Sequence, residues 1–130
     1  MELLSLDFLY VPSDDIDRDI AQHVDALGAE LEWKVRGMGT VVACLRVSDS
    51  GPRILLSGHL HDPLPILVFR VADYRDAVAR VRAAGITDVR ELEIPHGPVA
   101  SFVTANGQRL AVYELVRPEA NDYFLGRLDP

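Results

Sequence analysis

Two stretches of the chain carry the same order of apolar patterns. An apolar run rich in leucine and aromatic residues, Leu3–Val11, stops at the break Pro12-Ser13 and predicts a strand. Apolar residues then recur at spacings of four, four and three, which is typical of a helix with one apolar face. These positions are Ile16, Ile20, Val24 and Leu27. Ser13 or Asp14 is expected to cap this helix, and Gly28 to end it.

Three further strands are expected in the first half, with turn residues between them. They are Glu30–Arg36, Thr40–Val47 and Arg53–Ser57. The first of them alternates apolar and polar residues, so Leu31, Trp33 and Val35 are expected to share one face. The segment from Gly58 to Pro63 is interpreted as a linker.

The second half repeats this plan. A strand over Pro65–Val71 leads to a helix that Asp73 caps and Gly85 ends. The apolar side of this helix is predicted to comprise Tyr74, Ala77, Val78, Val81 and Ala84. Strands follow over Asp88–Ile94, Val99–Thr104 and Arg109–Val116, with turns at His96-Gly97-Pro98 and Asn106-Gly107.

Each half therefore has the order β-α-β-β-β, which predicts an α+β fold. We divide a single domain, residues 1–130, into module one (1–60), module two (64–117) and a tail (118–130). The tail contains a possible helical turn over Ala120–Gly126. Three apolar residues of this turn are available to dock on the body or on a partner: Tyr123, Phe124 and Leu125.

The composition narrows the possible partners and the compartment. The chain has 130 residues and a net charge of -7. This sign opposes phosphate backbones and anionic membranes, so neither nucleic acid nor a membrane is expected as a partner. Cys44 is the only cysteine and lies in an apolar run, which favours a small buried side chain over a nucleophile. The absence of a disulfide partner and of a basic, apolar leader favours a cytoplasmic protein.

The most distinctive motifs lie in the second half. They are the strand and helix cap at 66–73, the helix end Ala83-Ala84-Gly85, and the hairpin over 102–114. With them the chain resembles the vicinal oxygen chelate superfamily, which includes glyoxalase I, extradiol dioxygenases and bleomycin-resistance proteins. The resemblance covers residues 3–117. It implies two βαβββ modules whose strands form a curved mixed sheet, the cup of the glyoxalase/bleomycin-resistance fold.

The resemblance also locates where a metal would bind. Enzymes of the superfamily take divalent-metal ligands from the first and last strands of each module. The matching positions here are all aliphatic: Leu6, Leu55, Ile66 and Ala111. An unligated divalent ion among such side chains is prohibitively costly, so no metal cofactor is expected. Glu114 lies an odd number of residues after Ala111, and is interpreted as a strand-end acid that faces away from the cup.

Two linker histidines, His59 and His61, could begin a zinc site with Asp62 or the distant His96. Because they lie in a segment bounded by glycine and proline, we interpret them as solvated loop residues.

Strand alternation, counted from the four aliphatic positions, predicts the lining of the cup. The predicted ligand-binding residues are Phe8, Tyr10, Arg53, Leu55, Ile66, Val68, Arg70, Arg109 and Tyr113. An apolar floor with aromatic and arginine side chains suits an aromatic or amphipathic small molecule with an anionic or carbonyl group. In a second interpretation the side chains simply fill the cup, and the arginines pair with Glu91, Glu93 or Glu114.

Our leading hypothesis is a metal-free small-molecule-binding protein similar to the bleomycin-resistance branch, without catalytic residues and acting as a homodimer. A competing hypothesis is a glyoxalase- or dioxygenase-like enzyme. It would be a lyase or isomerase using Tyr10, Tyr113 or a glutamate as acid or base, or a metal enzyme with a shifted register. A third hypothesis is a non-catalytic interaction domain that works through its dimer surface and tail.

Overall fold

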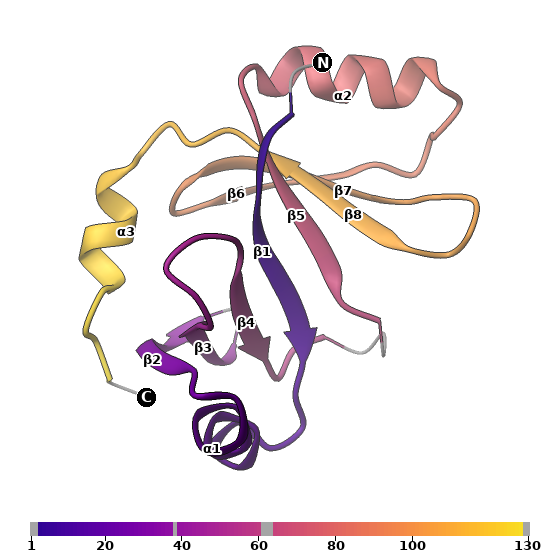
Figure 1. Ribbon diagram of the computed structural model, residues 1–130. Helices are drawn as coiled ribbons and strands as arrows, with labels where there is room; N and C mark the ends of the chain where they lie inside the picture. The colour runs from indigo at the N-terminus through magenta and orange to yellow at the C-terminus, as the bar shows by residue number, and fades with distance from the viewer. Residues whose placement is uncertain (1–2, 38, 61–63, 129–130) are drawn as a thin grey trace. The chain divides into compact units, whose positions relative to one another are not determined.

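A computed structural model describes residues 3–37, 39–60 and 64–128 of the chain (Figure 1). The elements are β1 (Leu3–Pro12), α1 (Ile16–Leu27), β2 (Glu30–Gly37), β3 (Thr40–Arg46), β4 (Arg53–Ser57), β5 (Ile66–Val71), α2 (Tyr74–Ala83), β6 (Arg90–Ile94), β7 (Gly97–Val103), β8 (Arg109–Tyr113) and α3 (Glu119–Phe124). The predicted α+β class and the β-α-β-β-β order of each half are confirmed. His61 and Asp62 of the suggested zinc site lie outside the described residues.

The strand order is β2-β3-β4-β1-β5-β8-β7-β6. The chain divides into two compact units. One, here called the N-terminal unit, comprises Phe8–Pro65 and the chain from Phe124 onward; the other, the C-terminal unit, comprises the residues up to Asp7 and Ile66–Tyr123. Strand β1 therefore contributes its first part to one unit and its second part to the other.

In the N-terminal unit, α1 packs on one face of the four strands. The buried cluster beneath it comprises Ala29, Ala43, Leu45 and Leu56, with Ile16 and Ile20 of α1 packed against it. Only the first half of the predicted apolar stripe of α1 is used, because Val24 is 37% exposed and Leu27 is 66% exposed. Gly28 ends the helix in a left-handed conformation, as predicted.

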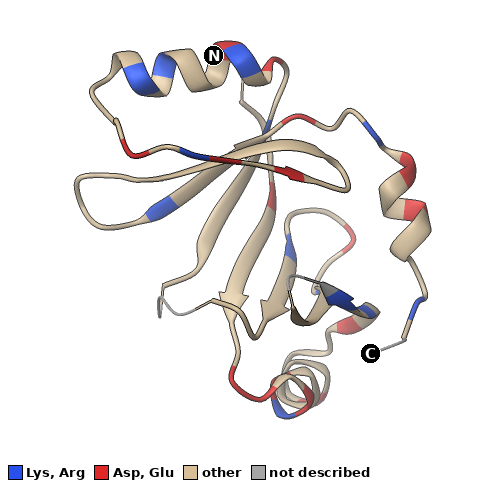
Figure 2. Ribbon diagram, turned by 180° about the vertical axis from the view of Figure 1, so that it is seen from behind, with Lys and Arg blue, Asp and Glu red and all other residues tan. Residues whose placement is uncertain are grey.

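The acidic residues before α1 belong to the start of the helix (Figure 2). The N-cap is Asp15, whose side chain accepts a hydrogen bond from the Arg18 amide at 3.1 Å, so the prediction of Ser13 or Asp14 was wrong by one or two positions. Asp14 instead forms an ion pair with Arg18 at 2.9 Å, and Ser13 donates a hydrogen bond to Asp19. Carboxylates at this end also stabilise the helix dipole.

A β-bulge in β2 changes which of its side chains share a face. Leu31 lies opposite Leu45 of β3, but Trp33 rather than Glu32 lies opposite the next residue, Cys44. One extra residue shifts the alternation by one position. Leu31 therefore packs on the α1 side, whereas Trp33 points to the other side, and the predicted common face of Leu31, Trp33 and Val35 was wrong.

In the C-terminal unit, α2 packs on the face formed by β5, β8 and β7. The buried cluster comprises Val71, Ala77, Val78, Val81, Ala100, Phe102 and Val112. Asp73 caps α2 as predicted, accepting from the Asp76 amide at 3.1 Å. Glu114 Oε1 accepts from the Tyr74 amide at 2.9 Å, so Glu114 faces the helix, as its odd offset indicated. Ala84, expected on the apolar side, is exposed.

The tail docks on the edge of β2, the outer strand of the N-terminal unit. Gly126 donates a backbone hydrogen bond to the Glu32 carbonyl, and Lys34 donates one to the Arg127 carbonyl, both at 2.8 Å. The Phe124 ring lies 5.2 Å from that of Trp33. The predicted docking is therefore confirmed for Phe124, whereas Tyr123 is 66% exposed and Leu125 is 60% exposed. A covered edge cannot pair with another chain.

Gly97 provides a test of the tight approach between β7 and the end of β8. The predicted turn at 96–98 lies one position earlier, because β7 already begins at Gly97. Its φ of 154° favours glycine, and an added Cβ would lie 2.1 Å from the Glu114 carbonyl oxygen. We expect Gly97→Ala to lower the free energy of unfolding by about 3 kcal/mol in urea titrations.

Gly107→Ala is the matched control. Gly107 also has a positive φ, 87°, but nothing lies within 4 Å of an added Cβ. It should therefore cost only the backbone strain, about 1 kcal/mol. Equal losses in the two variants would contradict the steric argument.

Candidate functional site

Each helix covers one sheet face of its unit, and we call the opposite side the helix-free face. In the N-terminal unit, parallel pairing places Phe8 opposite Arg53 and Tyr10 opposite Leu55. Paired residues of neighbouring strands project to the same side. Four of the predicted lining residues therefore share this face. Cys44 lies opposite Leu55 and joins them.

The C-terminal unit holds the other predicted lining residues. Parallel pairing places Val68 opposite Ala111 and Arg70 opposite Tyr113. Ile66 lies two residues before Val68, and Arg109 two residues before Ala111, so alternation places both on the same face. The Arg109 guanidinium donates to Ser101 Oγ at 3.4 Å. Val68 and Ala111 are buried, so they form an apolar floor beside the two polar side chains.

Arg70 and Tyr113 meet at a carboxylate, Asp7. The Tyr113 hydroxyl donates a hydrogen bond to Asp7 Oδ2, and Arg70 Nε lies 3.6 Å from the same oxygen. Ser5 donates to the other carboxylate oxygen at 2.5 Å. Arg70 Nε is buried without a hydrogen-bond partner among the described residues, although the Arg70 side chain is 36% exposed. Asp7 thus contacts the buried Nε of Arg70, while another part of the Arg70 side chain is exposed to solvent.

Burial raises the pKa of Tyr113, and the neighbouring Asp7 raises it further. The phenol therefore remains a protonated hydrogen-bond donor at neutral pH. His96 lies edge-on to the Tyr113 ring at 6.3 Å, and burial lowers the pKa of its imidazole. Tyr113 thus lies between Asp7, which accepts its hydrogen bond, and the neutral imidazole of His96.

Asp7 was missed by the sequence argument. Alternation along β1 selected Leu6, but the next residue, Asp7, is the one that reaches Arg70 and Tyr113. The available signal was an acid inside an otherwise apolar strand. The suggested acidic partners of the arginines were also wrong. Glu91 contacts Tyr74 and Arg82, and Glu93 contacts Arg117, whereas Arg70 and Arg53 pair with Asp7 and Glu32.

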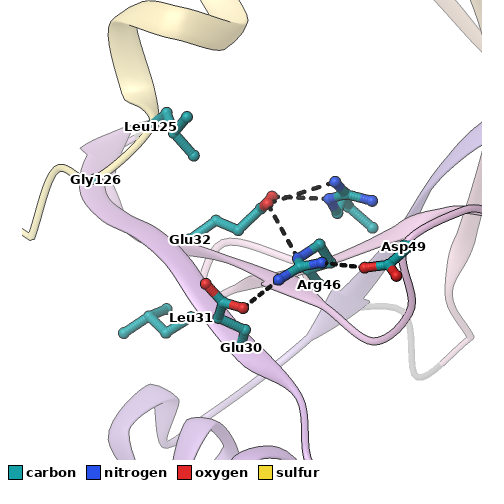
Figure 3. A pocket seen from close by; sticks show the side chains of 8 residues that line it. Glu30, Leu31, Glu32, Arg46, Asp49, Leu125 and Gly126 are labelled. Carbon is teal, nitrogen blue, oxygen red and sulfur yellow. Dashed lines mark hydrogen bonds and ion pairs between the residues drawn. The ribbon is translucent and has the colours of Figure 1, made fainter.

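A shallow pocket of about 430 Å³ lies in the N-terminal unit (Figure 3). Its lining comprises Glu30, Leu31, Glu32, Arg46, Asp49, Arg53, Leu125 and Gly126. Glu32 Oε1 accepts from Arg53 Nε at 2.8 Å, and Arg46 contacts Asp49 at 2.6 Å and Glu32 at 3.7 Å. Glu32 follows Leu31, which packs on the α1 side, so alternation places the Glu32 side chain on the opposite side. Because both guanidinium groups already contact carboxylates, the pocket is an ion-pair network rather than an open anion site.

Cys44 lies beside this network and is only 2% exposed. Its thiol lies 3.7 Å from Glu32 Oε1. Burial, and then the negative charge of Glu32, raises the pKa of the Cys44 thiol to about 12. A thiol with this pKa has almost no thiolate at neutral pH, so the interpretation as a small buried side chain is confirmed.

His59 is not the solvated loop residue that its linker position indicated. It is half-buried, and its Nε2 lies 3.3 Å from the Tyr10 hydroxyl. Its Nδ1 forms a hydrogen bond with Ser57 Oγ. Burial raises the pKa of Tyr10. The spacing of the linker histidines could not reveal this arrangement, because it depends on where β4 ends against β1.

Within residues 3–37, 39–60 and 64–128, no three His, Cys, Asp or Glu side chains are grouped so that they could hold a metal ion. In the same part of the chain, no helix is long and apolar enough to cross a membrane.

Comparisons with known proteins identify the fold. No protein-family model and no curated protein sequence matches the chain. The methylmalonyl-CoA epimerase of Mycobacterium tuberculosis is similar in structure, with a TM-score of 0.75 and 21% identity, over 92% of this chain and 93% of that one. A hypothetical protein from Bacillus halodurans C-125 has a TM-score of 0.71 and 16% identity, over 85% and 93% of the two chains.

A Streptomyces coelicolor methylmalonyl-CoA epimerase variant in complex with 2-nitronate-propionyl-CoA has a TM-score of 0.73 and 14% identity, over 89% of this chain and 100% of that one. At such identities the likeness establishes the fold alone. The chain has the vicinal oxygen chelate (glyoxalase/bleomycin-resistance) fold, as its motifs indicated.

The Cys44 thiol predicts part of the alkaline stability of the protein. Its ordinary pKa is 9.0 and its folded pKa is about 12, so its contribution to stability is complete below pH 9 and is lost as the pH rises towards 12. In Cys44→Ala, urea titrations across this range should show a shallower decline, by up to about 1.4 kcal/mol per pH unit. Parallel declines in wild type and variant would contradict the assignment.

Proposed function

We propose that this protein binds a small organic molecule with an anionic or carbonyl group, without a metal, in the manner of the bleomycin-resistance branch. One observation carries the proposal. Arg70 and Tyr113 are joined by Asp7 on the helix-free face, above an apolar floor. The four positions that supply metal ligands in enzymes of this fold are aliphatic here: Leu6, Leu55, Ile66 and Ala111.

The chemistry of the cluster supports this ligand class. A planar guanidinium recognises carboxylates and carbonyl oxygens through several donors. Asp7 lies 3.6 Å from the Nε of Arg70, and the Arg70 side chain remains 36% exposed, so the guanidinium can meet a ligand. Tyr113 donates its hydroxyl proton to Asp7 and is only 2% exposed, so it supports the ligand site by fixing the carboxylate that holds Arg70. The apolar side chains of Val68 and Ala111 favour an aromatic or aliphatic portion on the same ligand.

The similar structures suggest which molecules to test. One is a methylmalonyl-CoA epimerase in complex with methylmalonyl-CoA and NH4+, and another holds 2-nitronate-propionyl-CoA. Both organic ligands are acyl-CoA-type molecules with an acidic or anionic acyl group. We therefore include methylmalonyl-CoA in the ligand set, beside phenylpyruvate as an aromatic carboxylate. We further propose a cytoplasmic homodimer, which light scattering after size exclusion would test.

Calorimetric titration with these two molecules tests the site. We expect binding of at least one, and a 10- to 100-fold loss of affinity in Arg70→Gln, about 1.4–3 kcal/mol, because a charge-assisted contact is removed. Tyr113→Phe should lose about 10-fold. The exposed Arg90 provides a matched control, since Arg90→Gln removes the same charge from β6 and should leave affinity unchanged. Unchanged affinity in both Arg70→Gln and Tyr113→Phe would reject the site.

A thermal-shift panel tests independence from metals. Mg²⁺, Mn²⁺, Ni²⁺, Zn²⁺ and Fe²⁺ at micromolar concentration should give no saturable rise in Tm, because aliphatic side chains offer no lone pair to a cation. Ligand affinity should also be the same with and without a chelator. A saturable shift with one metal would overturn the metal-free assignment.

A second candidate function is a lyase or isomerase that acts on a carbonyl compound. The specific observation in its favour is that each unit contains a buried or half-buried tyrosine whose hydroxyl contacts a side chain that can act as an acid or base. Tyr113 donates to Asp7, and Tyr10 lies within hydrogen-bond distance of His59. A phenol with such a partner can exchange a proton with a ligand.

A further inference from the structure

We propose that Tyr10, His59 and Ser57 form a proton-transfer site for an organic ligand with an acidic C–H next to a carbonyl group. Tyr10 is the catalytic residue, His59 accepts its proton, and Ser57 is a positioning residue. The inference rests on the second candidate function and identifies the residues that would perform it.

The topology of the N-terminal unit brings the three side chains together. Parallel pairing places Tyr10 opposite Leu55 and Pro12 opposite Ser57, so Tyr10 and Ser57 lie on the same helix-free face, one pair apart. The chain turns at Gly58 after β4, and His59 then lies against both residues. The Tyr10 and His59 rings are 5.4 Å apart at 59°, with 3.3 Å between the Tyr10 hydroxyl and His59 Nε2. The His59 amide also lies 3.4 Å from Ser57 Oγ.

Burial sets the direction in which the three residues act. Ser57 has 0% exposure, so it cannot contact a ligand. Tyr10 and His59 are each partly exposed. Ser57 therefore acts from inside the protein as a hydrogen-bond partner of both His59 and Tyr10, and the ligand can be met only by Tyr10 and His59. A base oriented by a third group is the recurring geometry of activated side chains.

The proposed proton transfer requires the tautomer of His59 that carries its proton on Nδ1. With the proton on Nδ1, His59 donates to Ser57 Oγ, and its Nε2 lone pair accepts the Tyr10 hydroxyl. In the reactive step the Tyr10 proton moves to Nε2, and the Tyr10 oxygen takes a proton from the ligand carbon. The electrons of the C–H bond move into the carbonyl group and form an enolate. Return of a proton to carbon completes a tautomerisation or epimerisation, with no leaving group and no redox partner.

The partner is needed because burial opposes ionisation of Tyr10. A raised phenol pKa keeps Tyr10 protonated at neutral pH, so alone it would be a poor base. Transfer of its proton to His59 gives a phenolate–imidazolium ion pair with no net charge, in place of an isolated buried phenolate. Phe8 and Leu55 lie along the same face and favour an apolar group on the substrate.

Deuterium incorporation from D₂O tests the proposal, with phenylpyruvate and methylmalonyl-CoA as probes followed by NMR. Wild type should exchange the C–H next to the carbonyl of at least one probe. Tyr10→Phe should lose at least about 100-fold in rate, and His59→Gln at least about 10-fold. Ser57→Ala should alter the pH dependence of exchange, and Ser57→Thr, which keeps the hydroxyl, should restore it. His23→Gln, on α1, is the matched control and should exchange normally.

Calorimetry on the same samples separates the two proposals. A probe that binds wild type without exchanging would overturn the proton-transfer site and leave the binding function standing. Full exchange in Tyr10→Phe would also overturn it. Independently of any probe, ¹⁵N NMR of the imidazole should show His59 protonated on Nδ1 at neutral pH. Protonation on Nε2 would contradict the proposed direction of transfer.

Discussion

The packing of one helix against one face of its strands is the constraint on which the rest of each unit depends. Apolar residues that face α1 or α2, such as Leu56 and Val71, are almost fully buried. Successive side chains of a strand project to opposite sides, so burying these residues also fixes their neighbours. Leu55 and Arg70 must then occupy the helix-free face. The helix-facing clusters therefore determine the positions of the polar side chains without contacting them.

Periodic patterns explain what the sequence could predict. Helices and strands were found because apolar spacing of about 3.6 or 2 residues reflects burial on one side. The parity argument also placed Phe8, Tyr10 and Arg53 on one face correctly. It failed at β2, because a bulge inserts one residue without changing the composition of the strand. It also gave no reason to select Asp7, because spacing along β1 does not reveal its contacts with Arg70 and Tyr113.

The contacts of His59, Arg53 and Arg70 depend on the three-dimensional arrangement alone. Arg53 lies 21 positions from Glu32, and Tyr10 lies 49 positions from His59. No local pattern specifies such pairs, since many acids and hydroxyls could have served. In each unit the outcome is an arginine on the helix-free face whose charge is balanced by one nearby carboxylate. A partly buried charge is stable only with such compensation, and removing the acid would leave the arginine unpaired.

The division of β1 between the two units has a consequence for the order in which the chain can fold. Asp7 and Tyr113 are 106 positions apart, so the first strand leaves the ribosome long before β8 exists. The second part of β1 can pair with β4 early, whereas the residues up to Asp7 must wait for β5 and β8. Contacts of such long range slow folding. During synthesis the Asp7 carboxylate remains hydrated and without Tyr113, and the C-terminal unit is completed by residues that were synthesised well before the rest of it.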